Sequence, residues 1–235
     1  MGLVKHVQIF DSLEPANKAS AGLARFLDYM FNGLTLRAVK DGRLRFPLSW
    51  NLGTHGPMVD SVDFWGLNYY YRQRVSLRGR NGGRLHLLQP TPGAPVSDSG
   101  RSGAYGEIYP FGLYRALNRL KHSGKPIYIT ENGLPDATDR KRPGFLLAHL
   151  AQVQRAISEG VDVRGYYHWS FTDNFEWAEG WALRFGLVAL DHQTQLRKPR
   201  PSARLFSQMI SANAITCEMV AAHAPELLAE IFSHD

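Results

Sequence analysis

Cysteine is almost absent from this sequence, which has Cys217 alone among its 235 residues. A single cysteine excludes an intrachain disulfide framework and any zinc site built from several cysteines. Long apolar runs are missing too: none reaches the roughly 18 residues of a membrane span, and Met1 to His6 has no apolar stretch behind a basic start. We therefore expect a soluble, cytoplasmic protein that does not cross a membrane.

Clustered metal ligands are also missing. The nine histidines are scattered, and none forms a His-x-x-x-His pair or a cluster with Cys or Asp. We expect neither a metal ion nor an organic cofactor. His168, which follows an alternating apolar strand, is expected to point outward and to pack as a structural residue.

Acidic residues are fewer than basic ones, 21 against 27, and the formal net charge is +6. Such a balance suits an acidic partner, and the segment Arg78-Gly79-Arg80-Asn81-Gly82-Gly83-Arg84 resembles an Arg-Gly segment of RNA-binding proteins. The basic residues are dispersed, however, and the segment occurs once, with the composition of a solvated loop. We expect no nucleic-acid partner.

What the chain does contain is an alternation of short β-rich runs with helical periodicity, which is typical of a parallel α/β architecture. A complete (β/α)8 barrel takes about 250 residues, so this length is marginal for one. Strands are predicted at 3–10, 62–70, 126–130 and 161–170, and helices over 23–34, from Pro110, from Pro143 and over 202–210. We divide the chain into a main unit, 1–211, and a helical tail, 212–235.

The third predicted strand ends in a carboxylate, at Pro126-Ile127-Tyr128-Ile129-Thr130-Glu131-Asn132-Gly133. The carboxyl ends of parallel barrel strands build the active site, so Glu131 is a candidate catalytic group. An equally valid interpretation from position alone is that Glu131 only caps a turn.

The fourth strand favours the catalytic interpretation, because aromatic rings and acids crowd its end between Tyr166 and Trp177. Aromatic faces stack on sugar rings, and carboxylates accept hydrogen bonds from vicinal hydroxyls. A buried hydrophobic core explains any single ring, but it explains poorly why Asp173, Asn174 and Glu176 lie among the rings.

Ile129 to Gly133 resembles the nucleophile signature of family 1 glycoside hydrolases, the β-glucosidases, β-galactosidases and 6-phospho-β-glycosidases. Three further segments agree, in the right order. Asp63 to Tyr70 is similar to the family's sixth strand, Trp169 to Trp177 to its eighth strand, and 184–188 with 198–202 to the end of the domain. The resemblance spans roughly residues 1–210 and implies a TIM (β/α)8-barrel type of fold.

The resemblance also implies roles. Glu131 would attack the anomeric carbon as the nucleophile of a retaining β-glycosidase, Tyr70 would orient it, and Asn68 would lie near the 2-hydroxyl of a β-glycoside substrate. The other implied sugar contacts are Trp169 beneath the sugar, Glu176 and Trp177 at its remaining hydroxyls, and Phe185 lining the same subsite. Glu176 stands where phospho-sugar specialists have Ser, which favours a neutral glycone such as glucose or galactose.

The family's second carboxyl, the acid/base in a Thr-Phe/Leu-Asn-Glu-Pro segment of the fourth strand, has no counterpart here. Ser12-Leu13-Glu14-Pro15 is a look-alike without the Asn, and we interpret it as a surface turn. Because the family's early Gln and His-Trp pair are absent too, we expect strands five to eight only, a half-barrel with open edges.

Three functions remain open for such a half-barrel. It is a β-glycosidase subunit completed by a partner that supplies the N-terminal half-barrel, a catalytically inactive sugar-binding protein, or a truncated fragment. Its partner could be an N-terminal half-barrel chain or, through self-association, a second copy. Stimulation by a partner, binding without turnover, or aggregation would distinguish the three.

Overall fold

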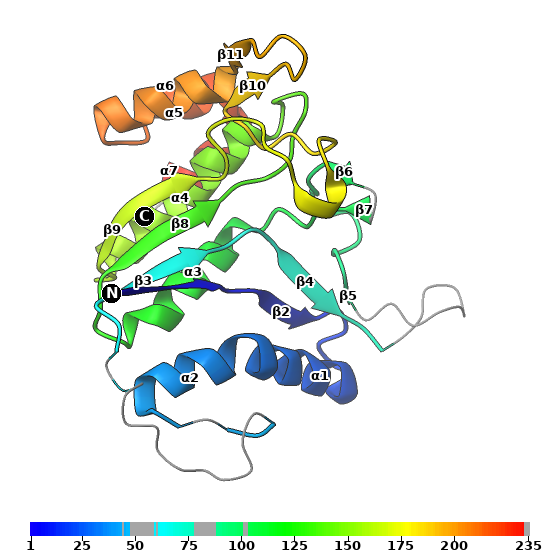
Figure 1. The fold of residues 1–235 in the computed structure, drawn as a ribbon, viewed down its shortest axis with the longest axis vertical. Coiled ribbons are helices and arrows are strands. Elements are labelled where there is room, and N and C mark those ends of the chain that lie inside the picture. Colours follow the sequence, from blue (N-terminus) through cyan, green and yellow to red (C-terminus); the bar gives the residue numbers. More distant parts are fainter. Residues whose placement is uncertain (44, 48–58, 60, 78–87, 101–102, 233–235) are drawn as a thin grey trace.

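The centre of the fold is a parallel sheet of four strands in the order β1-β3-β8-β9 (Figure 1). A computed structural model describes residues 1–43, 45–47, 59, 61–77, 88–100 and 103–232, and the Arg-Gly segment 78–84 lies outside these residues. The strands are β1 (Gly2–His6), β3 (Phe64–Asn68), β8 (Ile127–Asn132) and β9 (Val163–His168). All four end at the same edge, which is the geometry of consecutive barrel strands.

The two faces of this sheet are covered differently. On the convex face, Leu67, Ile127 and Ile129 are fully buried beneath α3 (Pro110–Lys121) and α4 (Arg142–Ser158), which lie behind the sheet in Figure 1. Alternation within each strand sends the intervening side chains to the concave face, the side that would become a barrel interior.

Helices α3 and α4 each have a proline in their first turn. Proline lacks a backbone N–H, so it is tolerated in the first helical turn, as at Pro110 and Pro143. The predicted inward face of α3 is confirmed, with buried Leu113, Leu117 and Leu120. In α4 the prediction was wrong for Ile157, which is 48% exposed, whereas the adjacent Ala156 is fully buried in the core cluster.

The first predicted strand, 3–10, is divided in the structure. Its second part forms β2 (Ile9–Ser12), which pairs with β4 (Arg72–Val75) in a separate small sheet that also holds β5 (Leu88–Gln89). The division falls at Gln8, whose backbone N–H donates to the Asn32 side chain at 3.1 Å instead of to a neighbouring strand.

The helix predicted over 23–34 is interrupted as well. It consists of α1 (Lys18–Asp28), one π-helical turn over Tyr29–Gly33, and α2 (Leu34–Asp41). The predicted single apolar face was wrong in part: Leu34 is buried, but Phe26 in α1 and Phe31 in the π-helical turn are 51% and 40% exposed.

The C-terminal segment packs against the main unit. After α5 (Pro201–Ala212), α6 (Cys217–His223) begins at Thr216, whose side chain accepts a hydrogen bond from the Met219 backbone N–H. Val220 and Ala224 are buried against α4 and α5 in a second apolar cluster. A short helix, α7 (Leu228–Phe232), ends the described chain, in which no helix is long and apolar enough to cross a membrane.

Two hairpins complete the described structure. β10 (Val188–Leu190) pairs with β11 (Arg197–Pro199) beyond the eighth-strand loop, and β6 (Ser99–Gly100) pairs with β7 (Gly103–Ala104).

Candidate active site

Glu131 stands at the carboxyl end of β8, where the sequence placed it. Its backbone carbonyl accepts a hydrogen bond from the Tyr69 N–H at 2.9 Å, and Asn68 lies directly opposite it on β3. The register of both strand pairs shifts at this point, as Thr130 gives way to Glu131. Such irregularities re-aim a side chain at a barrel rim, and here they leave the half-buried carboxylate at the strand end.

Tyr70 holds the carboxylate of Glu131. Its hydroxyl donates to Glu131 Oε2 at 2.5 Å, the length of a hydrogen bond to a charged acceptor. Burial, together with the hydrogen bond to this carboxylate, raises the pKa of Tyr70 far above its ordinary value. The hydroxyl therefore stays protonated and remains a donor, which is the orienting geometry that the family resemblance implies.

Asn68 is fixed from the neighbouring strand. Its side-chain oxygen accepts a hydrogen bond from the Thr130 hydroxyl at 2.6 Å. Because that bond uses the amide oxygen, the amide nitrogen is the group that can donate to a ligand.

Backbone and side-chain hydrogen bonds join the ends of β8 and β9 beside Glu131. The Trp169 N–H donates to the Asn132 carbonyl at 3.0 Å, and the Asn132 side chain is tied to the Tyr69 carbonyl and the Tyr166 hydroxyl. A Cβ on Gly133 would lie 1.7 Å from the Trp169 carbonyl oxygen, so only glycine fits this turn. Sequence reasoning quoted Asn132 within the motif but did not foresee that it braces both strands.

An aromatic cluster forms the wall behind Glu131. Fully buried Phe185 packs edge-on against Tyr70 and Tyr105, with ring centroids 6.5 and 5.2 Å apart, and Trp169 joins the same cluster. Sequence reasoning named Phe185 and Trp169 but missed Tyr105, which lies in an irregular loop without periodicity. Burial raises the pKa of Tyr105, as do the charges of neighbouring acids.

Glu176 is held at the rim of this wall. Its Oε2 accepts a hydrogen bond from the Asn174 amide at 2.8 Å, and the Asn174 side-chain oxygen accepts one from the Ser170 hydroxyl at 3.1 Å. Its charge acts on both Tyr70 and Tyr105. Glu176 therefore lies within electrostatic range of the tyrosines of this wall.

Trp177 is the predicted site residue that does not join the aromatic wall beside Glu131. Its side chain is 83% exposed, and its backbone φ of 44° turns the chain away at the start of a short 3-10 segment, Trp177–Glu179. A sugar contact by Trp177 stays a prediction.

Asp173 has a structural role. The prediction that this residue belongs to the sugar pocket was wrong. It is 4% exposed and pairs with both guanidinium nitrogens of Arg200 at 3.0 Å, while the Gly186 N–H donates to it at 2.9 Å. Burial alone would raise the pKa of Asp173, but the bonds from Arg200 and from the backbone lower it. The carboxylate is saturated and joins the β9 loop to the start of α5.

His168 lies on the opposite face of β9, as predicted. Its ring is 6.4 Å from those of Phe145 and Phe206 in the helical layer. Burial lowers the pKa of His168 to about 3, helped by the positive charge of Arg142, and burial lowers that of His149 to about 3. Both histidines are therefore neutral packing residues.

Glu14, the acid/base look-alike, lies in a turn as predicted. Its two carboxylate oxygens accept hydrogen bonds from the hydroxyls of Ser20 and Ser76, at 3.1 and 2.7 Å. These bonds tie β4 and α1 to the turn after β2, so Glu14 supports the fold. No group of three or more potential metal ligands gathers in the part of the chain that the structure describes.

A parallel sheet with helices on its convex face and a carboxylate held at a strand end has the geometry of part of a (β/α)8 barrel. Residues 52–215 match the model of glycosyl hydrolase family 1, and the chain belongs to that family. The predicted family and barrel type are thereby confirmed.

Individual relatives agree with this assignment. A β-galactosidase from Pyrococcus woesei is 30% identical over 86% of this chain and 42% of its own length, and one from Saccharolobus solfataricus is 40% identical over 67% and 33%. Among solved structures, a β-glycosidase from Pyrococcus horikoshii superposes with a TM-score of 0.77 at 33% identity, over 94% of this chain and 50% of its own. A β-glucosidase from Thermotoga maritima in complex with castanospermine gives 0.74 at 29% identity. The chain therefore spans about half the length of these solved proteins.

Proposed function

We propose that this chain carries the nucleophile half of a retaining β-glycosidase acting on β-glucosides or β-galactosides. The observation that carries the proposal is the pair formed by Tyr70 and Glu131, in which a permanently protonated hydroxyl holds one oxygen of a carboxylate at a barrel-strand end. Relatives named β-galactosidase and β-glucosidase support the glycone class.

The chemistry follows from this geometry. The free oxygen of Glu131 attacks the anomeric carbon, the bond from that carbon to the aglycone oxygen breaks, and the aglycone leaves with the electron pair. Water then cleaves the glycosyl-enzyme and returns the carboxylate. In this proposal Asn68 donates to the sugar hydroxyl beside the reacting carbon, and Glu176 accepts from hydroxyls at the far side of the ring.

The acid that protonates an ordinary aglycone comes from outside these 235 residues. In the described part of the chain, the outer edges of β1 and β9 have no strand partner. Val4 and Tyr167, on the concave face, are 52% and 59% exposed. A segment that supplies further parallel strands would cover both edges and both side chains, whether it belongs to the same polypeptide, to a separate N-terminal half-barrel chain, or to a second copy of this chain.

The decisive experiment uses a 2-deoxy-2-fluoro-β-glucoside with a dinitrophenolate leaving group, which departs without protonation and leaves a stable adduct. We expect mass spectrometry to locate the adduct on Glu131. Glu131→Gln should abolish labelling, whereas Glu176→Gln, which alters the other carboxylate of the site, should slow it and leave the labelled residue unchanged. Labelling of any other residue would contradict the assignment.

The same reagent identifies the source of the missing strands. Labelling that appears only with an added first-half segment of a relative would support a two-part enzyme. Labelling that rises with the concentration of the chain alone, in step with a dimer in light scattering, would support self-association. Absence of labelling under both conditions would favour the inactive sugar-binding or truncated alternatives.

A further inference from the structure

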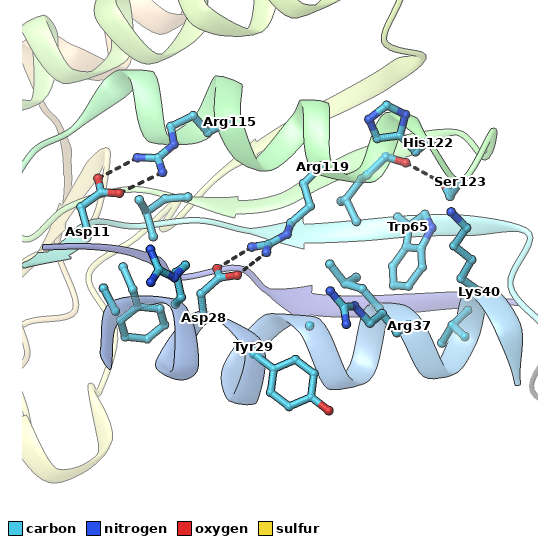
Figure 2. A pocket seen from close by; sticks show the side chains of 18 of the residues that line it. Asp11, Asp28, Tyr29, Arg37, Lys40, Trp65, Arg115, Arg119, His122 and Ser123 are labelled. Carbon is cyan, nitrogen blue, oxygen red and sulfur yellow. Dashed lines mark hydrogen bonds and ion pairs between the residues drawn. The ribbon is translucent and has the colours of Figure 1, made fainter. Parts of the chain in front are cut away.

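A second candidate binding site lies far from Glu131, on the helical side of the sheet. A cleft of about 1130 Å³ opens between the α1–α2 segment and α3, and Figure 2 shows its two walls. Two ion pairs cross it: Arg115 donates to both oxygens of Asp11, and Arg119 to both oxygens of Asp28. Apolar side chains of α2 and α3, including Leu36, Val39 and Leu120, pack in the same core cluster behind these ion pairs.

The lining of the cleft has a surplus of positive charge. Seven Lys and Arg side chains face two Asp, and both Asp are already engaged by Arg115 and Arg119. Arg25, Arg37, Lys40 and Arg74 form no ion pair with any residue that the structure describes. The cleft therefore favours an anionic occupant.

An unpartnered donor marks one end of this cleft. Trp65 is 3% exposed, and its indole Nε1 has no hydrogen-bond partner among the described residues. An indole N–H can only donate, so the group that would satisfy it is an acceptor. In Figure 2, Trp65 lies between Arg37 and Lys40 of the α2 wall and His122 beyond the end of α3.

We propose that this end of the cleft binds a small molecule carrying a phosphate group. A phosphate monoester brings close to two negative charges and three strong acceptor oxygens, which match the guanidinium of Arg37, the ammonium of Lys40 and the indole N–H of Trp65. The cleft floor is apolar, with Leu36, Val39 and Leu120, and suits the organic part of such a molecule. An extended polyanion would instead need cations spread over an open face.

This site is separate from the nucleophile. Trp65 is near the start of β3 and packs on the convex face with Leu67 and Ile127, whereas Glu131 is at the opposite, carboxyl end of β8. A ligand bound beside Trp65 and a sugar bound beside Glu131 therefore occupy different sides of the sheet.

The test is a titration of the Glu131→Gln chain with phenyl phosphate at low ionic strength, followed by the ¹H–¹⁵N signal of the Trp65 indole. The signal is assigned by its disappearance in Trp65→Phe. We expect a saturable shift, and we expect the double variant R37Q/K40Q to weaken binding by at least about tenfold, because two charge-assisted contacts are lost. The double variant R197Q/K198Q removes the same two charges from exposed β11 and should change affinity by less than about twofold.

Three results would overturn the proposal: no saturable shift of the Trp65 signal, a saturable shift confined to another tryptophan, or equal weakening by both double variants, which would indicate general charge attraction. Thermal melts of the four variants identify any change that comes from unfolding. Because the probe is no glycoside and the nucleophile is already replaced, each of these results leaves the proposed glycosidase function unaffected.

Discussion

Glu131 and Asp173 are two carboxylates near the ends of neighbouring strands, and the structure gives them opposite tasks. Asp173 is buried and accepts bonds from both nitrogens of the Arg200 guanidinium and from backbone N–H groups of the β10 region. Glu131 is half-buried and, among the described residues, its carboxylate accepts one hydrogen bond, from Tyr70. Saturation by donors, rather than position in the sequence, separates a structural carboxylate from one that can react.

The largest expected loss of stability comes from removing the ion pair between Asp173 and Arg200. Asp173→Asn leaves the Arg200 guanidinium buried without its counter-charge, and we expect the free energy of unfolding to fall by about 3–5 kcal/mol. Asp162→Asn removes an equivalent two-bond pair with Arg164, but that pair is exposed and screened by solvent, so its loss should cost much less. Urea denaturation of both variants measures the difference, and equal losses would contradict the contrast.

The pH dependence of stability comes next. His149 and His168 have a pKa of about 3 in the fold against an ordinary value of 6.5, so protons bind more readily to the unfolded chain. Their contribution is complete above pH 6.5 and is lost as the pH falls from 6.5 toward 3. At pH 5 the expected loss is about 2 kcal/mol for each histidine.

The pH range of the loss distinguishes the contribution of the two histidines from that of Asp173. The lowered pKa of Asp173 makes its contribution disappear only as the pH falls below the ordinary carboxylate value of 3.8. His149→Phe, which keeps a ring of similar size, should flatten the decline between pH 6.5 and 5. An unchanged slope in His149→Phe, measured by denaturation at several pH values, would refute this explanation.

Removing the hydrogen bond from Tyr70 to Glu131 is expected to have a smaller effect, on the rate of labelling. Tyr70→Phe removes a hydrogen bond to a charged acceptor, worth about 1.5–3 kcal/mol, so labelling by the activated fluoroglucoside should slow roughly 10- to 100-fold. Tyr105→Phe is the matched control, because Tyr105 packs edge-on against Tyr70 and, in the described chain, forms no hydrogen bond with Glu131. Equal slowing in both variants would indicate a general loss of packing instead.

Trp177 gives the smallest expected change in stability. Trp177→Ala should alter the free energy of unfolding by less than about 0.5 kcal/mol, because the side chain is already 83% exposed. Buried Phe185→Ala, from the same sugar-binding set, should cost about 3–5 kcal/mol. If Trp177→Ala nevertheless weakens sugar binding, measured by calorimetry, the predicted contact is supported.

Local signals in the sequence were sufficient for some elements and not for others. The apolar spacing of Leu113, Leu117 and Leu120 predicted the buried face of α3, because that spacing repeats with the helical turn. The π-helical turn over Tyr29–Gly33 and the division of the first strand at Gln8 have no such signal. Both depend on tertiary neighbours, including the Asn32 side chain that accepts from Gln8.

For the site, the residue pattern was sufficient to predict that Glu131 ends an apolar strand and that Asn68, Tyr70 and Phe185 follow a glycosidase pattern. Those properties can be predicted from adjacent residues or from a family motif. Three features became visible only in the folded chain: Asp173 is paired with Arg200, Tyr105 completes the aromatic wall, and Trp65 has an unpartnered donor in a basic cleft. The physical reason is that burial and hydrogen-bond saturation depend on groups distant in the chain, which no local pattern reports.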